Sequence, residues 1–387
     1  MALEKYNIEI EGLDYKEYNS DLYFEINLYD LIKNKVSEPI VSSKYDGLDI
    51  FCNELGLDRL DSNGASSDYS NMDKLVIPEH IKYLVLHMDL ERYDNIVITH
   101  KLEYVEMHLS IYDIDMNKII FHNFIKQISQ HSGMKSLCLI LNYELENFLN
   151  RRRILNLPHI DTYKYDSLET ESQVINYINE LLPRTLEYLR VNFIITNINE
   201  FTSLRVFKIE DDCSYNVPLD NLPESLEWLE INTDDFNYPL YNLPCKLKVL
   251  IFSHNRVAWN YTNGYMHSLN FLPLSLEVLF MPDTIMMDGT TKAEICNNLP
   301  PKLKYLYVPT MVVNNLDWNA LPESLEVLDA PLILYQMQQK EITINKLPKA
   351  LKEVRIRKAY LDNKTLSSYL EIFKETNCKI TGSDNFG

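Results

Sequence analysis

The ten residues Leu222–Ile231 read LPESLEWLEI, and the same arrangement returns along the second half of the chain. It consists of a Leu-Pro pair, two variable residues, a leucine, two more variable residues, and then Leu-x-apolar. Seven copies begin at Leu182, Leu222, Leu243, Leu272, Leu299, Leu321 and Leu347. Because the proline keeps one register in all seven copies, the recurrence indicates a repeated structural unit.

The residue types of the string predict a turn followed by a strand. The string ends in an apolar-x-apolar alternation, which is the pattern of a strand with one buried face. Proline fixes φ and has no N–H to donate, so it belongs in the turn before the strand and not inside a parallel sheet. We call the leucine three residues after the proline the frame residue, as Leu226 is in the copy quoted above.

Weaker copies, which lack the full Leu-Pro-led string but keep its apolar frame, begin at Ile77, Thr99, Gly133, Leu157 and Phe201. The frame positions are then Ile81, Leu102, Met134, Ile160, Leu186, Leu204, Leu226, Leu247, Leu276, Leu303, Leu325 and Leu351. The intervals between them are unequal, but they lie around the period of leucine-rich repeats. The chain is therefore predicted to be an α/β leucine-rich-repeat solenoid with a parallel concave β-sheet.

The length of each interval predicts what connects the strands. Two long intervals carry apolar stripes at helical spacing, formed by Ile120, Phe124 and Ile128 and by Val174, Ile178 and Leu181. The short intervals, such as the one from Leu204 to Leu226, have no room for a helix. We therefore expect helices on the convex side mainly in the first half of the chain, and thinner repeats in the second half.

The segments YNVPLDNLPESL (Tyr215–Leu226) and FNYPLYNLPCKL (Phe236–Leu247) resemble FNIP repeats. This variant of the leucine-rich repeat is found in social amoebae and in giant DNA viruses of amoebae. The resemblance is strong over 182–356, degraded over 76–181 and absent over 1–70. Family members often carry an amino-terminal F-box that docks a ubiquitin-ligase adaptor, but no Leu-Pro-led helical pattern of that kind precedes residue 75.

Composition divides the chain into three parts. Residues 1–75 are expected to form an acidic N-terminal cap or a divergent docking segment, because positions 1–70 hold fifteen Asp or Glu and six Lys or Arg. Residues 76–358 are the repeat solenoid of about 12 repeats. Residues 359–387 are expected to form a helix-strand cap, since the terminal repeats of a solenoid must hide its open core.

Composition also argues against several classes of function. The net charge of −19 argues against nucleic acid as the main ligand, because phosphate binding needs clustered Lys and Arg. The nine glycines form no GxG, the six cysteines no CxxC and the nine histidines no HExxH, so we expect no cofactor, no metal and no enzyme activity.

The first residues are acidic where a signal peptide would be apolar, and no apolar run approaches the length of a membrane span. A cytoplasmic protein is expected.

Residues that alternate with the buried frame should point onto the concave sheet, where we expect a partner-binding face. One predicted zone is a basic strip formed by Lys164, Arg190 and Lys208 on consecutive strands, suited to an acidic partner segment. The other is apolar and aromatic, and comprises Trp228, Val249, Ile251, Val278, Phe280, Pro282, Tyr305, Tyr307, Pro309 and Val327. The alternatives are a solvated charge column for the first zone, and plain strand propensity or a covering loop for the second.

The sequence favours a non-enzymatic protein–protein interaction scaffold that binds a protein partner on the concave face. Through the FNIP resemblance, a virus-encoded modulator of host proteins is implied, located in the host cytoplasm or the virion. Two alternatives stay open. One is a structural virion component or another self-assembling protein, and the other is a ubiquitin-ligase substrate receptor with a diverged docking segment. The oligomeric state is expected to be a monomer or a weak homo-oligomer.

Overall fold

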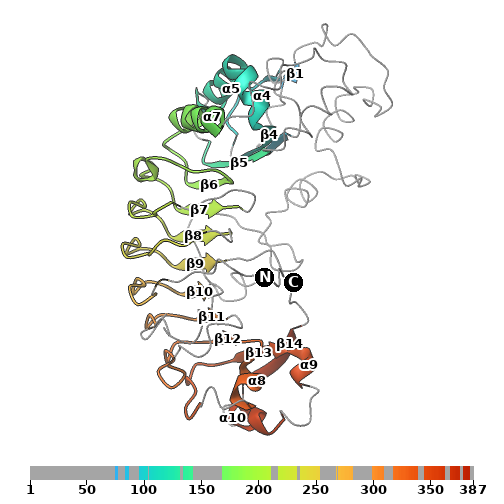
Figure 1. Cartoon of the computed structure of the whole chain (residues 1–387), viewed down its shortest axis with the longest axis vertical. Helices are drawn as coiled ribbons and strands as arrows, with labels where there is room; N and C mark the ends of the chain where they lie inside the picture. The colour runs from blue at the N-terminus through green and yellow to red at the C-terminus, as the bar shows by residue number, and fades with distance from the viewer. Residues whose placement is uncertain are drawn as a thin grey trace, which may run out of the picture. The chain divides into compact units, whose positions relative to one another are not determined.

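A computed structural model of the 387-residue chain shows a repeat protein built from parallel strands (Figure 1). It describes residues 75–76, 83–86, 96–102, 104–130, 134–142, 168–210, 217–232, 236–252, 267, 269–281, 299–308, 317–338, 344–361, 367–374 and 378–383. Residues 1–74 of the predicted N-terminal cap (1–75) lie outside these ranges. The described residues fall into two compact units, divided between Leu204 and Arg205.

The described part of the N-terminal unit holds four parallel strands paired in chain order. These are β2 (Tyr83–Leu86), β4 (Tyr104–Ser110), β5 (Ser136–Asn142) and β6 (Tyr188–Val191), and a separate pair joins β1 (Leu75–Val76) to β3 (Ile96–Val97). Its helical segments are α4 (Ile111–Met116), α5 (Lys118–Gln130), α7 (Leu168–Leu181) and η4 (Ile198–Glu200).

Both predicted helical stripes lie in helices, and one is shifted by a residue. In α5 the buried side chains are Phe121, Phe124, Ile125 and Ile128, whereas Ile120 is only half-buried. In α7, Val174 and Ile178 are fully buried. The two helices contact each other, and the Tyr177 hydroxyl donates a hydrogen bond of 2.8 Å to the Lys118 carbonyl oxygen.

The described part of the C-terminal unit contains eight parallel strands, again paired in chain order (Figure 1). They are β7 (Val206–Ile209), β8 (Trp228–Ile231), β9 (Val249–Phe252), β10 (Val278–Phe280), β11 (Tyr305–Tyr307), β12 (Val327–Asp329), β13 (Glu353–Arg357) and β14 (Lys379–Ser383). The helical segments α8 (Ile333–Gln338), α9 (Lys358–Leu361), η6 (Ser367–Leu370) and α10 (Glu371–Lys374) accompany the last strands.

The strands of this unit pair in the register that the repeat frame predicts. Val206, Trp228, Val249, Val278, Tyr305, Val327, Glu353 and Lys379 are successive partners from β7 to β14. The six frame leucines from Leu226 to Leu351 have side chains that are at most 5% exposed. The parallel β-sheet solenoid predicted from the repeats is therefore confirmed in this unit.

The Leu-Pro motif acts as a turn that precedes each strand. In six repeats the N–H of the frame leucine donates to the carbonyl oxygen of the proline three residues earlier, as from Leu226 to Pro223 at 3.0 Å and from Leu351 to Pro348 at 3.2 Å. Proline is thus the first residue of a four-residue turn, where its missing N–H costs nothing. The serine before the frame residue adds a bond between repeats, because Ser275 Oγ donates to the Leu247 carbonyl oxygen at 2.6 Å.

Candidate interaction surface

The predicted apolar zone is buried, so the expectation of an exposed apolar face is wrong. Trp228, Val249, Ile251, Val278, Phe280, Tyr305 and Val327 all have side chains that are at most 8% exposed, and Tyr307 is half-buried. Pro282 and Pro309 lie outside the described residues. The strand residues that alternate with them and point to the opposite face, such as Leu250 and Leu279, are 0% exposed. Burial on both faces is characteristic of parallel sheets.

Aromatic stacking shows how this zone is packed. The Phe280 ring stacks against the rings of both Tyr305 and Tyr307, with centroid distances of 5.0 and 5.4 Å. These three side chains come from the neighbouring strands β10 and β11. Stacked rings in a buried zone stabilise the sheet through packing, and they are not accessible anchors for a partner.

The predicted basic strip does not form in the expected arrangement. Lys208 is buried, with its Nζ 2.9 Å from Glu230 Oε2 and 5.1 Å from the centroid of the Trp228 ring. Arg190 is half-buried and is the strand partner of Cys138, because β5 pairs directly with β6. That pairing leaves no place between the two strands for Lys164, which is outside the described residues.

The column of residues on the predicted concave face becomes polar and partly exposed at the C-terminal end of the sheet, where the side chains of Asp329 and Arg355 are 14% and 25% exposed. Tyr307, Asp329, Arg355 and Thr381 are successive strand partners, and each of them is half-buried. We call these four residues the C-terminal concave strip. It contains one residue from the predicted face, Tyr307, and three that sequence reasoning did not single out.

A hydrogen-bond and ion-pair network organises this strip. The Tyr305 hydroxyl donates to Asp329 Oδ2 at 3.0 Å, and Arg355 Nη1 lies 3.8 Å from the same oxygen. Arg355 Nε donates to Glu353 Oε1 at 3.2 Å, and Thr381 Oγ1 donates to that carboxylate at 2.9 Å. The guanidinium of Arg355 is therefore held between two carboxylates contributed by β12 and β13.

The acidity of Asp329 is altered by its place in this network. Burial raises the pKa of Asp329 to about 6, against the lowering effect of Arg355 and of the Tyr305 hydrogen bond, while Glu353 adds to the increase. Since each of these groups lies on β11, β12 or β13, the ionisation state of Asp329 reports on the packing of three neighbouring repeats.

The stretch of chain around the strip is basic, although the whole protein is acidic. Residues 346–379 hold nine Lys or Arg and four Asp or Glu, a net charge of +5 in a chain of −19. Lys352, Arg357, Lys358 and Lys379 are exposed there. Clustered cations with exposed side chains attract an anionic segment over the distance of the Debye length.

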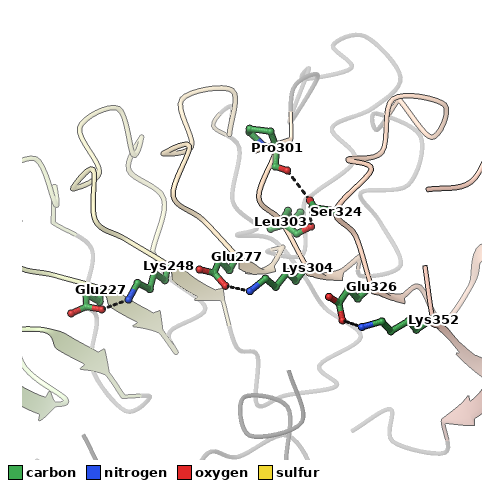
Figure 2. A network of polar contacts seen from close by, with 9 residues as sticks. All are labelled: Glu227, Lys248, Glu277, Pro301, Leu303, Lys304, Ser324, Glu326 and Lys352. Carbon is green, nitrogen blue, oxygen red and sulfur yellow. Dashed lines mark hydrogen bonds and ion pairs between the residues drawn. The ribbon is translucent and has the colours of Figure 1, made fainter. Parts of the chain in front are cut away.

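A charge ladder connects successive repeats at the position after the frame residue (Figure 2). Glu227 Oε2 accepts from Lys248 Nζ at 2.7 Å, and Glu277 pairs with Lys304 at 2.6 Å. The next rung joins Glu326 to Lys352 at 2.5 Å. Glu227 also accepts from Arg205 Nε at 2.8 Å, so it bridges two neighbouring repeats.

The signal for this ladder is visible in the sequence. The position after the frame residue alternates strictly in sign through Glu187, Arg205, Glu227, Lys248, Glu277, Lys304, Glu326 and Lys352. Each glutamate therefore meets a cation of a neighbouring repeat, and like charges at the same position are kept two repeats apart. The ladder thus joins neighbouring repeats in pairs, including the two that lead into β12 and β13.

The described part of the chain contains no group of three or more His, Cys, Asp or Glu that could hold a metal ion. Within the same residues no helix is long and apolar enough to cross a membrane. His108 Nε2 makes a 2.6 Å contact with Glu106 Oε1 on β4, which accounts for its polar surroundings.

Comparison with known proteins gives a structural similarity and no match by sequence. No family model matches the chain, and no curated protein matches it. Among solved structures, it is similar to CroV588, described as a novel circular LRR protein, with 16% identity and a TM-score of 0.34. The match covers 68% of this chain and 34% of that one, so the chain spans about a third of the length of that protein.

Proposed function

We propose that the protein is a non-enzymatic scaffold that binds an acidic segment of a protein partner at the C-terminal concave strip. The observation that carries the proposal is the coincidence of a partly exposed polar strip on the sheet with a net charge of +5 over residues 346–379 in an acidic chain. Repeat solenoids offer extended surfaces for protein partners and seldom carry chemistry.

The geometry of the strip supports this chemistry. Arg355 is held in place by Asp329 and Glu353, while Arg357 and Lys379 on the neighbouring strands are exposed. A fixed guanidinium and exposed cations together suit a carboxylate-rich peptide, which the fixed group orients and the exposed groups attract. Tyr307 supplies an aromatic surface beside the charges.

The resemblance of the repeats to FNIP repeats supports an amoebal or viral setting. In that setting the partner is a host protein, and the scaffold is a modulator of it. A role as a ubiquitin-ligase substrate receptor depends on the N-terminal segment up to residue 74, which lies outside the described ranges, so the sheet adds no support to it.

The test is binding of a fluorescein-labelled Asp/Glu-rich decapeptide, followed by anisotropy. The charge-reversed double variant Arg357→Glu/Lys379→Glu is expected to weaken binding at least about tenfold, and added salt should weaken the wild-type complex. The matched control is Lys101→Glu/Lys126→Glu, which reverses two exposed lysines elsewhere. Equal losses in the two double variants would contradict a specific site and indicate a response to net charge alone.

A further inference from the structure

Three exposed apolar side chains lie in the turns that precede β9 and β10, on what we call the turn edge of the C-terminal unit. Tyr241, Phe271 and Leu274 are 52%, 57% and 72% exposed. The Tyr241 and Phe271 rings meet edge to face, with their centroids 5.3 Å apart and their planes at 87°. An aromatic pair that is exposed beside a third large apolar side chain is typical of an interaction surface.

The repeat frame shows how this edge is arranged. The residue after each proline is Glu224, Cys245, Leu274 and Pro301 in four successive repeats, whose strands β8 to β11 are direct neighbours. Cys245 Sγ lies 3.9 Å from Glu224 Oε2, so these turns are adjacent in space as well as in register. The apolar group occupies the two middle turns of the four.

Charges of opposite sign flank the apolar group. Glu224 and Asp220 are exposed in the turn before it, and Lys302 is exposed in the turn after it. With strands about 4.8 Å apart, the acidic and basic ends are separated by about 14 Å. Lys246 is also exposed, in the second turn, so the edge runs from acidic, through an apolar turn with one lysine and a second apolar turn, to basic.

We propose that this edge binds a second copy of the chain in an antiparallel, two-fold arrangement. A two-fold axis between the two middle turns places Glu224 of one copy opposite the partner's Lys302 and brings the two apolar groups together. Isologous contacts require a surface that is complementary to itself, and the outer charges Glu224 and Lys302 meet that requirement. The parallel arrangement would place Glu224 against its own copy, which is repulsive.

The size of the group sets the strength of the contact. Three large side chains per copy are fewer than a standard interface uses, so the dimer forms in the range of about 10 to 100 µM. The net charge of −19 opposes association at low salt, and moderate salt favours it by screening that charge. The inference is independent of the C-terminal concave strip, because it uses none of its residues.

The test is sedimentation velocity from about 5 to about 300 µM, with a reducing agent present so that exposed Cys245 cannot supply a disulfide. Leu274→Asp is expected to weaken dimerisation at least about tenfold. Its matched control is Ile119→Asp, which places the same charge on a side chain that is 77% exposed in α5 and should leave dimerisation unchanged.

Charge exchange tests the antiparallel geometry itself. Glu224→Lys and Lys302→Glu alone should each weaken the dimer by about fivefold or more, and the double variant should return to within about threefold of the wild type. A wild-type chain that stays monomeric at the highest concentration would overturn the proposal. A dimer whose affinity is unchanged by Leu274→Asp would overturn it as well. The same holds if the charge-exchanged double variant dimerises more weakly than both single variants. Binding of the acidic decapeptide should be the same in all these variants.

Discussion

Glu227 is the most connected carboxylate of the charge ladder, since it accepts from both Arg205 and Lys248. Burial tends to raise its pKa, but the hydrogen bonds from Lys248 and Arg205 outweigh that effect and hold the pKa below its ordinary value. The contribution to stability is therefore present at neutral pH and is lost as pH falls through this lowered pKa. Glu227→Gln is expected to cost about 1 kcal/mol at neutral pH.

The measurement is urea unfolding at several pH values, and the control is Glu323→Gln. Glu323 also pairs with a lysine, Lys346, but both side chains are more than half exposed. Solvent screens that pair, so the control should have no measurable effect. A loss for Glu323→Gln as large as that for Glu227→Gln would show that the ladder is no stronger than an ordinary surface ion pair.

Asp329 has the opposite dependence on pH. Its folded pKa of about 6 exceeds the ordinary value of 3.8, so its contribution to stability is fully present below that ordinary value and is lost as pH rises through 6. Asp329→Asn cannot titrate, and its side-chain oxygen can still accept from Tyr305. Between acidic and neutral pH, the free energy of unfolding of the wild type should therefore fall by about 1–3 kcal/mol relative to that of Asp329→Asn. A difference that is constant with pH would contradict a buried, proton-binding Asp329.

At the scale of strands, the two faces of the sheet are both buried, and a pair of phenylalanines tests this directly. Phe280 lies in β10 and is 8% exposed, while Phe271 lies on the turn edge and is 57% exposed. Phe280→Ala is expected to lower the free energy of unfolding by about 3–5 kcal/mol, as for other buried aromatic side chains. Phe271→Ala should change it by no more than about 0.5 kcal/mol. Similar costs in chemical denaturation would contradict the burial of the concave face.

The elements that the sequence could predict are those specified by local chemistry. The Leu-Pro turn, the alternation after it and the register of β7 to β13 all follow from residues within one repeat. The exposure of the concave face did not follow, because alternation tells which way Trp228 or Phe280 points and not what lies against it. The predicted strand order that places Lys164 beside Arg190 was wrong, because β5 pairs directly with β6. The ladder was predictable, because its alternating charges stand at one fixed position.

At the scale of the whole molecule, the ladder makes the order of repeats matter. In a solenoid, each repeat contacts mainly its neighbours, so stability is close to a sum of repeat and interface terms. An alternating ladder adds an interface energy whose sign depends on whether the two repeats in contact carry opposite or like charges at the ladder position. Two repeats exchange places without penalty only when they stand an even number of positions apart, because only then does each charge meet its opposite.

Deletion of whole repeats tests this parity. Removing residues 247–275 joins Lys246 to Leu276 and keeps the turn, but it brings Glu227 beside Glu277. Removing residues 247–302 joins Lys246 to Leu303, also keeps the turn, and brings Glu227 beside Lys304. The shorter deletion removes one repeat and the longer one removes two, so the shorter one should cost more than half the free energy of unfolding that the longer one costs. Added salt should stabilise the shorter deletion more than the longer one, because salt screens the new like-charge contact. Urea unfolding at low and high salt measures both effects. If the two deletions respond to salt alike and each removed repeat costs the same, the ladder does not specify the order of the repeats.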